Sequence, residues 1–163
     1  MNRVNIARFG TKTIRYIIVL VILIVIAGSA TYAVMSDTSI HGLTVRFYNN
    51  VSRDCTNSTL TFNFNQVVVY STASLETSLS HVHFTMSADG VLVGTVSALD
   101  SKFGSGQSVS YSLTFSNATL DPHSQPLKSQ IGLGITALVS AGLYSSMITA
   151  SDSEPVTFSS LPC

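Results

Sequence analysis

Hydrophobic and polar residues alternate with a period of two along most of the chain after residue 42. The apolar members are mainly β-branched or aromatic, which is typical of half-buried strands. The clearest runs contain Leu43, Val45 and Phe47; Leu60, Phe62 and Phe64; Val82, Phe84 and Met86; and Val109, Tyr111, Leu113 and Phe115. Because no amphipathic helix interrupts these runs, the pattern predicts an all-β fold, a β-sandwich over residues 43–163.

Short polar and glycine-containing segments separate the predicted strands. Asp89-Gly90 lies between His81–Ala88 and Val91–Ser97, and this dipeptide is a strong signal for a β-hairpin with a two-residue turn. Gly104–Gly106 and Asp121-Pro122 predict further turns.

The segment Ile131–Ala150 has no charged residue over twenty positions, so its length also fits a second membrane helix. However, it contains three glycines and five serines or threonines, and its apolar residues alternate until Ala141-Gly142. We therefore expect two strands here. A second span would place Cys163 back on the cytoplasmic side.

One segment departs from the period of two. Ile17–Ala27 is unbroken Ile, Val, Leu and Ala, and the apolar stretch extends over Tyr16–Met35. Twenty residues of helix are about 30 Å long, enough to cross a bilayer, so we expect a single transmembrane helix before the sandwich. The alternative is a cleaved signal peptide, with small residues at Gly28–Ala30 as the cleavage site. Residues 36–42 are expected to form a short polar connection.

The formal charge is zero overall but is unevenly distributed. Arg3, Arg8, Lys12 and Arg15 give the first fifteen residues +4, whereas eight acids and four bases give the chain from Asp37 onward −4. The positive-inside rule then places residues 1–15 as a basic tail in the cytoplasm and the sandwich outside the cell membrane. Without a basic patch on the folded part, a nucleic-acid partner is not expected.

Two features agree with an extracellular domain. Three glycosylation sequons follow the apolar segment, at Asn50, Asn57 and Asn117. We expect occupancy at Asn50 or Asn57, and less at Asn117, which closely follows a strand end. The only two cysteines, Cys55 and Cys163, are expected to form a disulfide bond in an oxidising compartment. The alternative is two unrelated thiols.

Four segments together resemble a known family: Val67–Ser71, Leu79–Val82, Phe84–Gly94 and Gly106–Phe115. They are similar to the type-2 late-embryogenesis-abundant (LEA-2) family, also called the water-stress and hypersensitive-response domain. The family's usual Asn-Pro-Asn is replaced here by Ser71–Leu75. The resemblance implies a seven-stranded, fibronectin-III-like or immunoglobulin-like β-sandwich and no active site. Several members, archaeal ones included, carry a single N-terminal membrane helix.

The sequence offers few candidates for chemistry. His81 and His83 have the spacing of a strand metal site, which needs a third ligand such as His123 or Asp100. Two solvated histidines on a polar strand face are the simpler interpretation. The chain has no Gly-x-Ser-x-Gly motif and no phosphate-loop motif, and its eight acids are scattered singly. We therefore expect no enzyme activity, no cofactor and no small-molecule substrate.

Three functions remain open at this stage. The first is a structural or accessory membrane protein that engages another envelope protein, or itself, beside the lipid bilayer. Gly28, Ser29 and Ala30 would allow close helix packing there. The second is a pilin-like filament subunit, since Arg8–Gly10 loosely resembles an archaeal processing site. Cleavage there would leave Lys12 and Arg15 in an apolar filament core. The third is a metal- or ligand-binding module.

Overall fold

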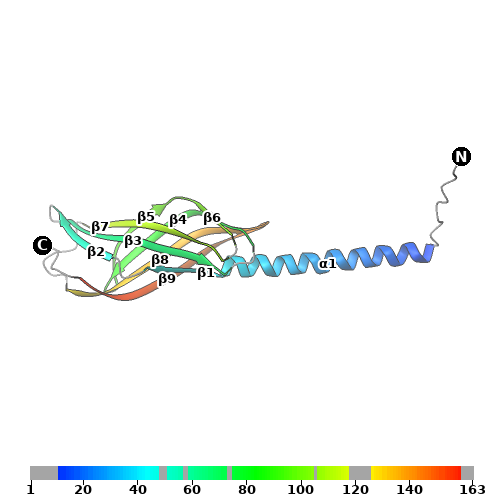
Figure 1. Ribbon diagram of the computed structural model, residues 1–163, viewed down its shortest axis with the longest axis horizontal. Coiled ribbons are helices and arrows are strands. Elements are labelled where there is room, and N and C mark those ends of the chain that lie inside the picture. The colour runs from blue at the N-terminus through cyan, green and yellow to red at the C-terminus, as the bar shows by residue number, and fades with distance from the viewer. Residues whose placement is uncertain are drawn as a thin grey trace. The chain divides into compact units, whose positions relative to one another are not determined.

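The computed structural model describes residues 11–47, 51–56, 59–72, 75–104, 106–117 and 126–158, and it describes side chains from residue 15 onward, except that of Thr56. The chain divides into two compact units between Val34 and Met35. The first unit contains most of one long helix. The second contains the end of that helix and all the strands, shown in Figure 1.

Helix α1 extends over Thr11–His41 and contains the predicted span Tyr16–Met35. The polar connection expected at residues 36–42 is wrong for all but Gly42, because residues 36–41 are helical. Ser36, Ser39 and Ile40 are buried in this last part of α1, although Asp37 and His41 stay exposed. Ser39 and Ile40 come three and four positions after Ser36, so the three buried residues lie on one helix face. Packing of that face explains why poor helix formers remain helical.

The described strands form two antiparallel sheets. Their bounds are β1 Leu43–Phe47, β2 Val51–Thr56, β3 Thr59–Ser71, β4 Thr77–Ala88, β5 Val91–Ala98, β6 Ser101–Phe103, β7 Ser108–Asn117, β8 Lys128–Ala141 and β9 Tyr144–Thr157. The first sheet holds β1, β2, β3 and β7, and the second holds β4, β5, β6, β8 and β9. The prediction of an all-β fold behind one apolar helix is confirmed at this level.

Two pairs of short strands each replace one long strand. Along residues 60–70 of β3 one edge is occupied by β7, so β1 and β2 must share the other edge. In the same way β8 occupies one edge of β4, and β5 and β6 share the opposite edge. The sheets therefore have three and four strand positions, in the orders (β1, β2)–β3–β7 and (β5, β6)–β4–β8–β9.

The core consists of the residues that alternate inward from both sheets. Phe47, Phe64 and Phe115 form two edge-to-face pairs with ring centroids 5.4 and 5.6 Å apart. Phe84 of one sheet meets Tyr111 of the other at 5.2 Å. All apolar positions of the first three predicted runs are buried or, at Leu43, half-buried. In the fourth run Leu113 and Phe115 are buried, whereas Val109 and Tyr111 are half-buried at the edge of the core.

The predicted hairpin at Asp89-Gly90 is present, and so are the two strands expected within Ile131–Ala150. Ala88 pairs with Val91 across Asp89-Gly90, whose φ angles of 50° and 81° lie in the left-handed region that a type I′ turn requires. The charge-free segment Ile131–Ala150 forms most of β8 and the first half of β9, joined at Gly142-Leu143. The alternative of a second membrane helix is therefore wrong.

Candidate functional site: the apolar helix, its junction and the surface residues

The first part of α1 is apolar on every side and exposed. Every side chain of Arg15–Thr31 is solvent-exposed, including the ten consecutive large aliphatic residues Ile17–Ile26. Among the described residues, α1 alone is long and apolar enough to cross a membrane, within Arg15–His41. A helix that is hydrophobic all round needs an apolar environment on all faces. A lipid bilayer would supply it.

Two hydroxyl groups in this part of α1 bond to the helix's own backbone. The Ser29 hydroxyl donates to the Ile26 carbonyl oxygen at 2.9 Å, and the Thr31 hydroxyl donates to the Ala27 carbonyl oxygen at 2.9 Å. Hydrocarbon offers no hydrogen-bond partners, so such internal bonds are what a membrane helix requires. An added Cβ at Gly28 would meet no atom within 4 Å, which leaves this face open to another helix.

The end of α1 is joined to the strands of the second unit through the Ser39 hydroxyl and Gly42. The Ser39 hydroxyl donates to the Met35 carbonyl oxygen at 2.7 Å and accepts from the Leu75 N–H at 3.4 Å. Gly42 has no room for a side chain, because a Cβ there would lie 2.7 Å from Thr72 Oγ1 and 2.8 Å from the Thr38 carbonyl oxygen. The chain can therefore turn from helix into β1 only at this small residue.

The histidine pair lies on β4, where the ladder is irregular. His81 has a φ of 52°, and the register of β4 with β8 shifts between Ser80 and His83. This bulge shifts the pairing of β4 with β8 beside the histidines, although Val82 between them stays buried. Both side chains are exposed, and His83 Nδ1 lies 3.0 Å from the Ser97 hydroxyl oxygen.

The proposed third ligands do not complete a metal site in the described part of the chain. Asp100 accepts the backbone N–H of His81 at 3.1 Å, which ties down the β5–β6 connection. His123 lies outside the described residues. Among the residues that are described, no three His, Cys, Asp or Glu side chains are close enough to hold a metal ion. The geometry therefore gives the metal site no support.

Of the three sequons, only Asn117 is described, since Asn50 and Asn57 lie outside the described residues. The Asn117 side-chain nitrogen, the atom that would carry a glycan, donates to the Val93 carbonyl oxygen at 2.8 Å. Glycosylation would replace one of the two hydrogens on this nitrogen. Glycosylation stays a prediction at all three sites.

Arg53 was not predicted as a core residue, yet it lies buried on the inward face of β2. Its guanidinium donates to the Pro126 carbonyl oxygen at 2.8 Å and stacks over the Phe158 ring, with the guanidinium carbon 4.1 Å from the ring centroid. Burial lowers its pKa, although an arginine remains protonated at neutral pH. Through these contacts Arg53 holds the segment after β9 against β2.

That contact bears on the predicted disulfide bond. Cys55 follows Arg53 by two positions on β2 and is not a free thiol, whereas Cys163 lies outside the described residues. Cys163 comes five positions after Phe158, and an extended chain covers about 3.3–3.6 Å per residue, so Cys163 is within reach of Cys55. The bond stays a prediction.

An open groove lies between the edge strands β5 and β7. It is lined by Val96–Leu99 and Ser110–Thr114 and has a volume of about 680 Å³. Its lining contains hydroxyl and apolar side chains but no acid, base or cysteine, so it offers no nucleophile–base pair among the described residues. Tyr111 closes its floor by donating to the Ser101 hydroxyl at 2.8 Å.

The structure defines an apolar helix followed by an antiparallel two-sheet domain. No protein-family model matches the chain, and no curated protein matches it. It is similar to a solved protein structure from Archaeoglobus fulgidus, at 13% identity and a TM-score of 0.39, over 73% of this chain and 97% of that one. It is also similar to the putative ApaA protein from Bordetella pertussis, at 12% identity and a TM-score of 0.46, over 74% and 97%. Similarities this low carry no functional argument.

Proposed function

We propose that the chain is a non-enzymatic, single-pass membrane protein. Its N-terminus lies in the cytoplasm, and it displays a β-sandwich outside the cell membrane as a structural or accessory subunit. The observation that supports it best is the run Ile17–Ile26, which is apolar on every face of α1 and entirely exposed. Arg15 and Asp37, the charged residues nearest to the run, are 22 positions apart and match the length of a bilayer span.

The finer fold type belongs to the same proposal. The orders (β1, β2)–β3–β7 and (β5, β6)–β4–β8–β9 give three and four strand positions. This arrangement agrees with a seven-stranded, fibronectin-III-like sandwich and with the resemblance to the LEA-2 family. Such a domain supports a role in binding another protein, or a second copy, through its surface rather than through a catalytic cleft.

Topology is tested by protease accessibility in intact cells. With an affinity tag at the N-terminus, added protease should digest the region after Asp37 and leave the tag intact. Tag exposure together with protection of the domain would contradict the proposal. Loss of the tag during maturation would instead indicate processing, as a pilin-like subunit or a cleaved signal peptide requires.

A matched pair of variants tests the cause of the orientation. Replacing Lys12 and Arg15 with Gln removes half of the N-terminal positive charge, and we expect a fraction of the chains to insert in the opposite orientation. Replacing Lys102 and Lys128 with Gln removes the same charge far from the span and should leave the orientation unchanged. Equal effects of the two changes would argue against the positive-inside mechanism.

A further inference from the structure

The turn between β8 and β9 carries the most exposed large hydrophobic side chain among the described residues. Leu143 is 90% exposed, and Tyr144 and Met147 beside it are about half exposed. The turn has two residues, with Gly142 first at a φ of 62°, as a type II′ hairpin turn requires. The backbone therefore presents Leu143 at a fixed tip.

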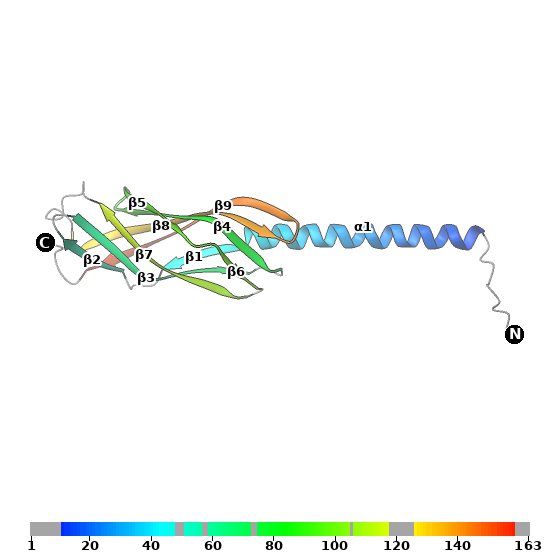
Figure 2. The same cartoon turned by 90° about the horizontal axis from the view of Figure 1, so that it is seen from above.

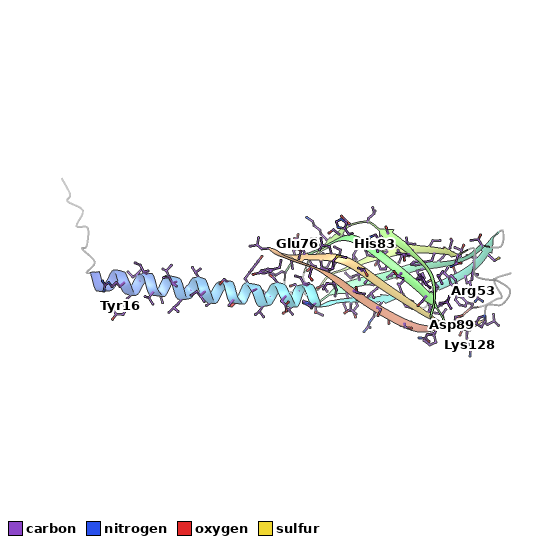
Figure 3. The ribbon with its side chains drawn as sticks, turned by 180° about the vertical axis from the view of Figure 1, so that it is seen from behind. Tyr16, Arg53, Glu76, His83, Asp89 and Lys128 are labelled. Atoms are coloured by element: carbon purple, nitrogen blue, oxygen red, sulfur yellow. The ribbon has the colours of Figure 1, made fainter. Side chains whose placement is uncertain are left out.

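The register places this tip at the end of the sandwich that residues 35–41 join. Ala141, the last residue of β8, pairs with Thr77. Two residues before Thr77, the N–H of Leu75 is bound by Ser39 near the end of α1. Figures 1 and 2 show the β8–β9 turn at this same end. In Figure 3 Glu76 lies at this end too, whereas Arg53, Asp89 and Lys128 lie at the opposite end.

The composition of the hairpin suits a membrane interface. No charged residue occurs from Ser129 to Ser151, so the tip enters a headgroup layer without desolvating a charge. Leu143 in the turn is apolar, and Tyr144 next to it has an apolar ring and a polar hydroxyl. Side chains of these two kinds are favoured at membrane–water boundaries. At the opposite end the exposed residues Val91 and Leu92 directly follow the turn Asp89-Gly90, which contains a charged residue.

We propose that the β8–β9 tip inserts Leu143 into the interface of the outer leaflet and thereby gives the sandwich a second contact with the bilayer. This inference rests on the proposed function, because residues 36–41 directly follow the predicted span and identify the end of the sandwich that faces the membrane. The partner that the tip contacts is the lipid surface itself. The second contact restricts rotation and tilt of the domain, which leaves the opposite end as the surface presented to partners.

The absence of tryptophan from the chain makes a direct test possible. Three variants of the full chain each receive one tryptophan: Leu143→Trp at the tip, Leu92→Trp at the opposite end and Val25→Trp within the span. Leu92 is 60% exposed and serves as the matched surface control. Each variant is reconstituted in phosphatidylcholine vesicles with and without lipids brominated on their acyl chains, and quenching of the tryptophan fluorescence is measured.

We expect strong quenching for Val25→Trp, clear quenching with a blue-shifted emission for Leu143→Trp, and neither effect for Leu92→Trp. If Val25→Trp is quenched but Leu143→Trp resembles Leu92→Trp, the tip does not contact lipid, and the proposed membrane anchor still stands. A blue shift of Leu143→Trp without quenching would show contact with protein instead and would overturn the inference. Equal quenching of Leu143→Trp and Leu92→Trp would also overturn it. An unquenched Val25→Trp would overturn the membrane anchor and the inference together.

Discussion

Among single residues, Tyr111 connects the two sheets most directly. Its ring packs against Phe84 of the other sheet, and its hydroxyl donates to Ser101 beside β4. Burial raises its pKa above the ordinary value, the Ser101 hydrogen bond lowers it in part, and the negative charge of Asp100 raises it. The folded state therefore disfavours the ionised phenol. The associated stability is fully present below about pH 10 and is lost as the pH rises through the raised pKa.

Replacing Tyr111 with Phe keeps the ring and removes the ionisable hydroxyl. We expect a loss of about 1 kcal/mol in the free energy of unfolding near neutral pH, the usual size for one hydrogen bond. Between about pH 9 and pH 12 the variant should lose less stability than the wild type, because one titrating group is gone. Tyr70→Phe is the control, since the Tyr70 ring only stacks under Arg46. Denaturant unfolding at several pH values measures both effects, and parallel alkaline profiles for all three proteins would contradict the assignment.

Among the elements, the turn at Asp89-Gly90 offers a test of backbone conformation alone. Gly90 has a φ of 81°, and a Cβ added there would meet no atom within 4 Å. Gly90→Ala should therefore lower the free energy of unfolding by about 1–2 kcal/mol, because an alanine is strained in the left-handed backbone conformation.

Gly94, four residues later on β5, supplies the matched control. Its added Cβ also meets nothing within 4 Å, and its φ is not in the left-handed region. Gly94→Ala should be neutral or slightly stabilising, since alanine restricts the unfolded chain. Thermal unfolding of both variants decides the point: a neutral Gly90→Ala would mean that the turn is not of the I′ type.

The alternation of apolar residues predicted most strands because each has one buried and one exposed face. It did not predict β2, where the inward positions after Val51 are Arg53 and Cys55. An arginine on an inward face breaks the pattern, and its partners Pro126 and Phe158 are distant in sequence. The helical end of α1 was missed for a related reason. Ser-Asp-Thr-Ser is typical of a linker, and only burial of Ser36, Ser39 and Ile40 against the second unit favours the helix.

Likewise, the bulge at His81 has no signal in the sequence, because the shift arises from how β4 fits β8. Both histidines are nevertheless exposed on either side of the buried Val82, and among the described residues no third ligand joins them. Sequence reasoning identified the apolar helix well, since composition alone defines it. It did not identify the tip at Leu143, because its position depends on the register of two sheet strands.

For the whole molecule, the disulfide bond is the strongest testable connection between distant parts of the chain. If Cys55 and Cys163 are bonded, replacing either with Ser should lower the free energy of unfolding by about 4–5 kcal/mol, as expected for a loop of roughly 100 residues. Membrane topology should not change. Ser52→Ala, an exposed change on the same strand, is the control and should fall within about 0.5 kcal/mol of the wild type. Peptide mapping without reductant checks the bond, and ready alkylation of both cysteines would disprove it.

The pairing of β4 has a consequence for the order of events during synthesis. Its partner β5 follows after a two-residue turn, but its other partner β8 begins forty residues beyond Ala88. Until β8 has been synthesised, the edge of β4 that β8 will pair with remains open. Such an intermediate is prone to aggregation, and long-range strand pairing is slow. We therefore expect a chain stalled before residue 128 to be cleaved by proteases more readily than the finished domain, because this edge of β4 is unpaired in it.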